Sequence, residues 1–164
     1  MPLGRFLEIG IATQDVAAAL AFYESLGFVQ ASVGAAWPHP YAVVTDGRLC
    51  LGFHATDIES PLPTWAVPNL RERLEELRAL GIEPEQARLD ELSLHEALVR
   101  DPAGRPLRLL EARTFSPPAL DPGYESVLGY FEEIAVGVTD LASAGRFWEA
   151  MGFVAFEPVT DPVP

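Results

Sequence analysis

The chain has 164 residues, of which 49% are apolar and 21% are charged, which is the balance of a globular protein. Its formal net charge of −13 disfavours binding to polyanions, so we expect neither nucleic acid nor a membrane among its partners. The N-terminal stretch MPLGRFLEIG lacks the pattern of a signal peptide, and no apolar run approaches the ~20 residues of a membrane helix, so we expect a cytoplasmic protein.

The first 53 residues predict a βαβββ unit. Residues 5–12 alternate with the period of a strand, with Leu7, Ile9 and Ile11 on one face and Phe6, Glu8, Gly10 and Ala12 on the other. Asp15 is suited to cap a helix that ends at Gly27, because apolar residues recur at helical spacing between them. Two further apolar runs flank Asp46-Gly47, which is a strong hairpin signal.

A second unit follows when the first is shifted by about 54 positions. Asn69 takes the place of Asp15 and Gly81 that of Gly27, with four leucines at helical spacing between them. The turn sequence DPAG at 101–104 separates two strand-like runs. The segment PLPTWAVP occupies the place of the first strand, although its three prolines weaken that assignment.

Residues 130–155 repeat residues 5–30, with eleven identical positions, and Glu133 stands where Glu8 stands. The pattern predicts a domain of two units over residues 1–113, a linker over 114–127 and a partial third unit over 128–164. Because the third unit has no closing hairpin, we expect it either to be covered by a second copy in a homodimer or to begin a second pair of units.

The motifs IGIATQD…FYESLGF and DPAG resemble those of the vicinal oxygen chelate superfamily, which includes glyoxalase I, bleomycin-resistance proteins and extradiol dioxygenases. The resemblance implies an α+β fold in which paired βαβββ units form an open, curved sheet around a ligand cavity, as in the glyoxalase/bleomycin-resistance fold. It says little about activity, because one fold hosts unrelated chemistries.

The resemblance also implies four positions at which catalytic members hold a divalent metal. They correspond here to Glu8, Leu62, Arg108 and a place near Leu51. Only Glu8 can bind a cation, and the Arg108 guanidinium repels one. We therefore predict no catalytic metal. A Glu8–Arg108 ion pair in its place and separate solvation of the two side chains remain equal alternatives.

Further ligand contacts are predicted at Trp37, Tyr41 and Phe53, which are suited to hold a flat molecule or to fill the core; for Trp65 we favour the core. The three histidines, His39, His54 and His95, show no metal-binding spacing, and each is interpreted as a solvated or hydrogen-bonded side chain.

The sequence therefore favours a binding protein that holds a small organic molecule in its cavity without a catalytic metal. An aromatic or cationic ligand would suit the negative charge of the chain. One alternative is a metal-dependent lyase, isomerase or dioxygenase of the same superfamily, using Zn, Ni, Mn or Fe. A non-catalytic structural module, with its cavity filled by side chains, is the other.

Overall fold

The computed structural model describes residues 3–33, 37–90, 94–112, 123–129 and 131–156. The first unit contains β1 (Arg5–Ala12), α1 (Val16–Ser25), β2 (Val29–Ala31), β3 (Tyr41–Thr45) and β4 (Cys50–His54). The second contains β5 (Leu62–Val67), α2 (Leu70–Ala79), β6 (Gln86–Arg88), β7 (Glu96–Arg100) and β8 (Pro106–Glu111), and α3 (Leu141–Ala150) follows. Both predicted βαβββ units are confirmed, including the proline-rich first strand of the second.

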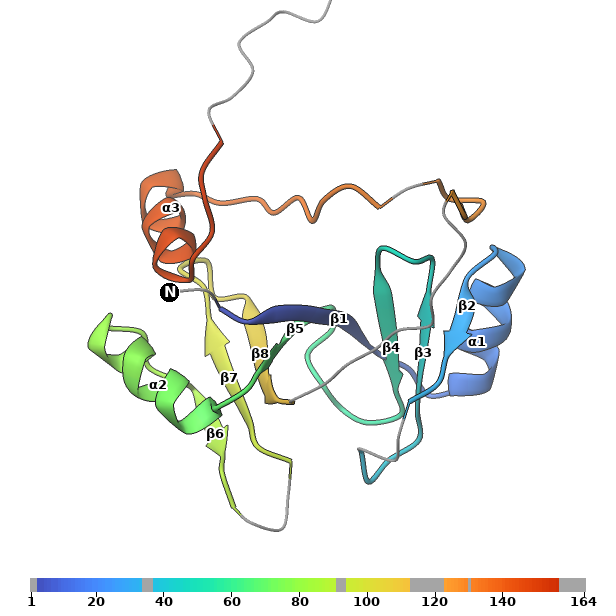
Figure 1. The fold of residues 1–164 in the computed structure, drawn as a ribbon, viewed down its shortest axis with the longest axis horizontal. Helices are drawn as coiled ribbons and strands as arrows, with labels where there is room; N and C mark the ends of the chain where they lie inside the picture. Colours follow the sequence, from blue (N-terminus) through green and yellow to red (C-terminus); the bar gives the residue numbers. More distant parts are fainter. Residues whose placement is uncertain (1–2, 34–36, 91–93, 113–122, 130, 157–164) are drawn as a thin grey trace, which may run out of the picture.

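The strands form one curved mixed sheet in the order β2-β3-β4-β1-β5-β8-β7-β6 (Figure 1). The two units meet at its centre, where β1 and β5 run antiparallel, and each of these strands pairs in parallel with the last strand of its own unit. The second unit thus repeats the first about an approximate twofold relation, and the predicted fold class is confirmed.

The ends of the elements follow from local chemistry. The Asp15 side chain accepts a hydrogen bond from Ala18 N at 2.9 Å and caps α1, and Gly27 ends it with a φ of +92°, which a residue without Cβ adopts most readily. In the hairpin between β3 and β4, Asp46 Oδ1 accepts from the amides of Arg48 and Leu49. These bonds fix the turn that the sequence predicts.

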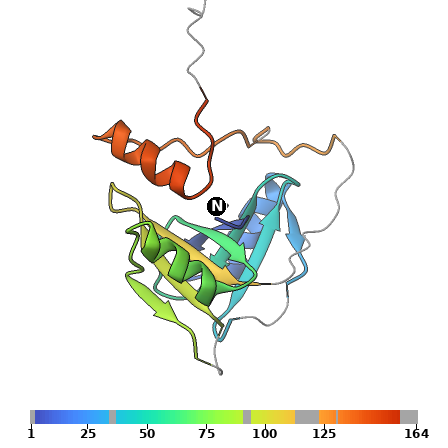
Figure 2. The ribbon, with the colours of Figure 1, turned by 60° about the vertical axis from the view of Figure 1, so that its left-hand side comes forward.

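Two helices cover the convex side of the sheet, one for each unit (Figures 1 and 2). Helix α1 contacts β2, β3 and β4, and α2 packs on β8. The predicted leucines Leu70, Leu74 and Leu77 are buried in a core cluster with β7 and β8. None of the helices in the described ranges lies on the concave side (Figure 1), where side chains of the strands and residues 37–39 contribute to the surface.

A bulge in β1 changes the predicted alternation of its side chains. The pairing with β5 shifts between Phe6 and Glu8, so Leu7 has no partner in the register. Phe6 therefore packs on the convex side against Trp65, with ring centroids 5.4 Å apart, while Leu7 clusters with Ala66 and Leu110. The predicted faces of Phe6 and Leu7 were wrong, whereas that of Glu8 is as predicted.

The C-terminal segment packs on the first two units through α3. Phe147 and Met151 enter the core cluster of α2, Leu3 N donates to Met151 O at 2.8 Å, and Arg105 Nη1 donates to Gly137 O at 2.9 Å. Residues 131–137, which repeat most of β1 in sequence, form no strand. Glu133 is consequently exposed, whereas Glu8 is buried.

Most of the linker predicted over 114–127 lies outside the described residues, as does the end of the third unit. Within the described part of the chain, no helix is both long and apolar enough to cross a membrane.

Candidate functional site

The concave face carries a small group of buried polar side chains from the central strands. Glu8 of β1, His54 of β4 and Arg108 of β8 are only 1%, 0% and 6% exposed. Room for Glu8 comes from Gly52 on the neighbouring strand, where a Cβ atom would lie 2.3 Å from Glu8 Oε2. A charged group this deeply buried requires partners, and each of the three has a different set.

A chain of contacts connects Glu8 to the surface. The Tyr41 hydroxyl donates to Glu8 Oε2, and Glu8 Oε1 lies 3.2 Å from His54 Nε2. His54 Nδ1 in turn lies 3.0 Å from Nε2 of His39, whose ring is partly exposed. Two imidazole rings thus link a buried carboxyl group to the concave surface.

The loop before β3 brings these rings together. Tyr41 begins β3 opposite His54 in the register, and their ring centroids are 4.6 Å apart. Prolines flank His39 in the sequence WPHPY and restrict the backbone before the strand. Trp37 then stacks on His39 with a centroid distance of 5.6 Å and an interplanar angle of 29°.

Arg108 has an incomplete set of partners. Its guanidinium lies 5.0 Å from the Trp37 ring centroid, and its Nε atom is 3.8 Å from Glu96 Oε2. Its Nη1 atom is buried and has no hydrogen-bond partner. Burial lowers the pKa of Arg108, and the nearby carboxylates of Glu96 and Glu8 oppose that shift.

A cavity of about 510 Å³ lies next to these groups. Trp37, His39 and Arg108 form one part of its wall, and Leu62 and Leu98 contribute apolar surface. Its polar lining also includes Asp57, Glu59, Gln86, Arg88 and Glu96. The cavity thus combines a flat ring, a base and a cation that has a free donor.

Two further pKa shifts describe the electrostatics of the site. Burial lowers the pKa of His39, as do the neighbouring His54 and Arg108, while Glu96 opposes the shift. Burial and the adjacent Glu8 raise the pKa of Tyr41, which keeps its hydroxyl group protonated as a donor. At neutral pH His39 is therefore an uncharged imidazole.

Four of the five predicted ligand residues lie at or behind this cavity. Trp37 and Arg108 line it, whereas Glu8 and Tyr41 lie behind His54 and His39. The assignment of Phe53 is corrected, because Phe53 is buried on the convex side with its ring 5.1 Å from Tyr23 of α1. Trp65 is buried, as predicted.

The structure does not form the Glu8–Arg108 ion pair. Among the described residues, Glu8 contacts Tyr41 and His54, while the acidic neighbour of Arg108 is Glu96. His39 and His54 are the site residues that the sequence did not identify. His54 could have been found from its position two residues after Gly52 on β4, since alternate residues of a strand share a face and Gly52 lies beside Glu8.

The donor atoms do not fit a divalent metal. The residues that lie next to Glu8 on the neighbouring strands are not the predicted Leu62 and Leu51. On β5 the neighbour is Thr64, which pairs with both Glu8 and Arg108, and on β4 it is Gly52. Both carboxylate oxygens of Glu8 are engaged, and Arg108 is a cation. Within the described ranges, no group of three or more His, Cys, Asp or Glu side chains could hold a metal ion.

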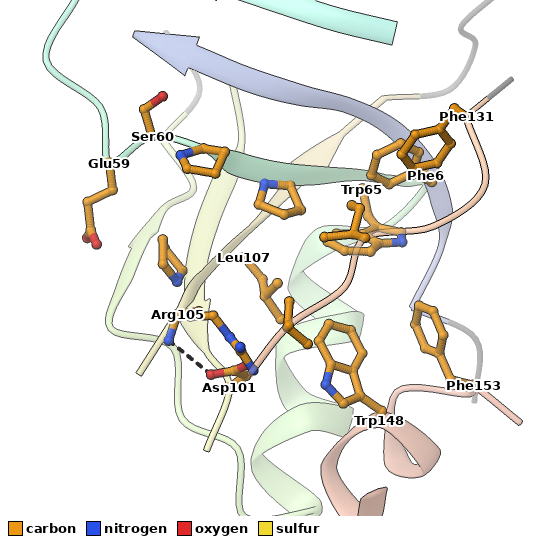
Figure 3. A pocket seen from close by; sticks show the side chains of 15 residues that line it. Phe6, Glu59, Ser60, Trp65, Asp101, Arg105, Leu107, Phe131, Trp148 and Phe153 are labelled. Atoms are coloured by element: carbon orange, nitrogen blue, oxygen red, sulfur yellow. Dashed lines mark hydrogen bonds and ion pairs between the residues drawn. The ribbon is translucent and has the colours of Figure 1, made fainter. Parts of the chain in front are cut away.

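A second cavity, of about 630 Å³, lies between the convex side and the C-terminal segment (Figure 3). It is mostly apolar, with rings from Phe6, Trp65, Phe131, Trp148 and Phe153. Its charged groups form an ion pair: Arg105 Nε donates to Asp101 Oδ2 at 2.8 Å, and Arg105 Nη2, which is buried without a hydrogen-bond partner, lies 2.6 Å from the same oxygen. Because Asp101 already neutralises this guanidinium at 2.6 Å, whereas Arg108 Nε lies 3.8 Å from Glu96 Oε2, the concave cavity is the stronger candidate for an added ligand.

Solved structures share the fold. A methylmalonyl-CoA epimerase from Mycobacterium tuberculosis aligns over 70% of this chain and 92% of its own, with 19% identity and a TM-score of 0.52. A hypothetical protein from Bacillus halodurans aligns over 70% and 98%, with 16% identity and a TM-score of 0.51. A catechol 2,3-dioxygenase aligns over 93% of this chain, with 18% identity and a TM-score of 0.56.

The chain spans 57% of the length of that dioxygenase. No protein-family model matches the sequence, and no curated protein matches it. At these identities the comparisons establish the fold, and the function has to be argued from the site.

Proposed function

We propose that this chain, which has the fold of the vicinal oxygen chelate superfamily, binds a small organic anion in its concave cavity without a catalytic metal. The cavity volume of about 510 Å³ lies within the range of small-molecule sites. Its lining combines the ring surface of Trp37 with several polar and charged side chains, which can fix the orientation of such a ligand.

The observation that carries this proposal is the buried Nη1 atom of Arg108, which has no hydrogen-bond partner. A buried donor left without an acceptor costs about 1–3 kcal/mol, and a carboxylate in the cavity would remove that cost. Trp37, which already contacts the guanidinium, offers its ring to an apolar part of the same ligand. An anion therefore suits the site better than the cation that the overall charge suggests.

The proposal is tested by calorimetric titration with phenylacetate and with phenethylamine, which differ in the sign of their charge. We expect the anion to bind and the amine not to bind. Arg108→Met should weaken phenylacetate at least about tenfold, since a charge-assisted hydrogen bond contributes about 1.5–3 kcal/mol. Arg105→Met, which changes the other cavity, is the matched control. Absence of anion binding to the wild-type protein would refute the proposal.

The metal-free part of the proposal rests on the poor donor set around Glu8. It is tested by elemental analysis of the purified protein and by adding Zn, Ni, Mn or Fe ions during thermal unfolding. We expect no stoichiometric metal and no specific stabilisation. A bound metal that is lost in Glu8→Gln would instead support the metal-dependent enzyme.

We also propose a homodimer through residues 128–164. Residues 131–137 have the sequence of a central strand but pair with no strand, and apolar side chains are exposed around them, including Leu128, Ile134, Val136, Val154 and Phe156. A second copy would cover this surface. Light scattering coupled to size-exclusion chromatography should give twice the 17.8 kDa chain mass, and a monomer at micromolar concentration would contradict the dimer.

A further inference from the structure

The contacts from Glu8 to His39 form a continuous path from a buried carboxyl group to the cavity. Tyr41 and His54 occupy the two oxygens of Glu8, and His54 contacts His39 through its other ring nitrogen. His39 itself lines the cavity beside Trp37. The binding role proposed above requires Arg108 and Trp37 but gives no task to this path.

The path fixes which nitrogen of each ring carries hydrogen. A Glu8 carboxylate only accepts, so Nε2 of His54 donates to it and Nδ1 of His54 is an acceptor. Nε2 of His39 must then donate to that acceptor, which leaves the lone pair on His39 Nδ1. No described residue occupies this Nδ1 atom. A base with a third group orienting it is the arrangement of acid–base sites.

We propose that His39 is the general base of a keto–enol isomerisation, acting on a 2-oxo acid whose carboxylate Arg108 holds. This inference rests on the anion-binding function proposed above and adds a reaction to it. Arg108 and His39 both contact the Trp37 ring and line the same cavity, so a ligand that enters beside that ring meets the cation and the base together.

The reaction transfers one proton and needs no co-reactant. The C–H bond next to the carbonyl group breaks, the proton goes to His39 Nδ1, and its electron pair forms the carbon–carbon double bond of an enolate. His39 then returns the proton to the oxygen, which gives the enol, or to the carbon. The guanidinium of Arg108 faces the carboxylate and the oxygen on which negative charge develops.

The substrate class follows from the groups present. An uncharged imidazole removes a proton from carbon only where a neighbouring carbonyl group makes it acidic. The described lining has one buried guanidinium with a free donor, so the carboxylate and the carbonyl oxygen have to share it. A 2-oxo acid has these two groups on adjacent carbons. The lowered pKa of His39 keeps the base uncharged at neutral pH.

Glu8 and His54 act as positioning residues. The carboxylate holds His54 in one tautomer, and His54 holds His39 in the tautomer whose Nδ1 faces away from the path. When His39 accepts a proton, its Nε2–H bond to His54 strengthens. The negative charge of Glu8 then stabilises the positive charge on His39 through His54. Replacement of Glu8 by Gln removes that charge and changes the hydrogen-bonding direction.

The test uses phenylpyruvate, whose C3 hydrogens are acidic and whose ring suits Trp37. Deuterium incorporation at C3 in D₂O is followed by proton NMR, and binding is measured in parallel by calorimetry. We expect the full chain to accelerate exchange about 100-fold or more over buffer. His39→Gln should lose this acceleration while binding changes less than about threefold, and His95→Gln, a histidine away from the cavity, should retain it.

The outcomes distinguish the general base, the anion site and the positioning role from one another. Phenylpyruvate that binds without faster exchange, or exchange that survives in His39→Gln, overturns the general base and leaves the binding function intact. Failure to bind overturns the anion site and, with it, the reaction. The positioning role has an independent readout in nitrogen-15 NMR of the imidazoles, which should show His39 as the Nε2–H tautomer. An Nδ1–H tautomer in the wild-type protein would refute the path even if Glu8→Gln failed to fold.

Discussion

His54 and Glu8 lie on neighbouring parallel strands with their side chains 3.2 Å apart and almost completely buried. Removal of Glu8 would leave the Tyr41 hydroxyl and His54 Nε2 without this partner, and removal of His54 would leave Glu8 Oε1 and His39 Nε2 without theirs. The pair therefore belongs to the stability of the fold as well as to the candidate site.

A double-mutant cycle should measure the coupling within this pair. We expect Glu8→Gln and His54→Gln each to lower the free energy of unfolding by about 1–3 kcal/mol, because a buried group loses its partner. The double substitution should cost less than the sum, with a coupling of about 0.5–3 kcal/mol in urea denaturation. The surface pair Glu59 and Arg100 is the control and should show a weaker coupling, because solvent screens it. Additive costs at Glu8 and His54 would contradict their direct contact.

Gly52 should tolerate no side chain. Its Cβ would lie 2.3 Å from Glu8 Oε2, and Glu8 is held there by two partners, so Gly52→Ala should lower the free energy of unfolding by about 1–3 kcal/mol. Gly10 is its neighbour in the register, but a Cβ there meets nothing closer than 3.4 Å. Gly10→Ala is therefore the matched control, and equal costs in denaturant unfolding would contradict the packing described.

Arg108 should contribute to binding at the expense of stability. Its guanidinium is buried with one donor unpaired, so Arg108→Met should leave the free energy of unfolding unchanged or raise it by up to about 2 kcal/mol. Arg105→Met should instead lower it by about 1–3 kcal/mol, because the buried Asp101 loses its ion pair. A large loss of stability in Arg108→Met would show that Arg108 is a structural residue.

The lowered pKa of His39 predicts a pH dependence of stability. Below the unfolded-state pKa of about 6.5 the unfolded chain binds the proton at this residue more strongly than the folded chain does. The contribution of His39 to stability is thus complete above about pH 6.5 and is lost as the pH falls through the folded-state pKa. His54, Arg108 and Glu96 are the charged or titratable groups that face it.

Chemical denaturation at about pH 5 and about pH 8 checks this sign. The difference in free energy of unfolding between these two values should be smaller in His39→Gln than in the wild-type protein. His95→Gln serves as the control for loss of a histidine elsewhere. An unchanged difference in His39→Gln would mean that the protonation of His39 is not linked to folding.

The elements of this fold could be predicted because their signals are local. Asp15 and Gly27 bound α1, the Asp46-Gly47 turn joins β3 to β4, and the leucines of α2 recur at helical spacing. Each of these depends on residues within a few positions of one another. The internal repeat then related the two units, so the fold class followed from the sequence as well.

The site could be predicted only in part, because it depends on register between distant strands. The bulge after Phe6 places Leu7 on the opposite face of the sheet from the predicted one, and a bulge cannot be predicted from strict alternation of side chains. The sequence assigned a metal-ligand position near Leu51, one residue before Gly52. Because side chains alternate along a strand, that assignment concerned the opposite face of β4 from the one on which Gly52 and His54 lie. The meeting of His39 with His54 depends on a loop whose path no periodicity describes.

Helix α3 should be part of the cooperative core rather than an appended segment. Met151 is 1% exposed within the cluster that contains α2, and its carbonyl accepts from Leu3 N near the other end of the chain. Met151→Ala should therefore lower the free energy of unfolding by about 2–4 kcal/mol through the cavity that it leaves. Leu141→Ala, at an exposed position of the same helix, should change it by less than about 0.5 kcal/mol. Equal, small effects in thermal and denaturant unfolding would mean that α3 does not share the fold of the first two units, and the second cavity would then lose one of its walls.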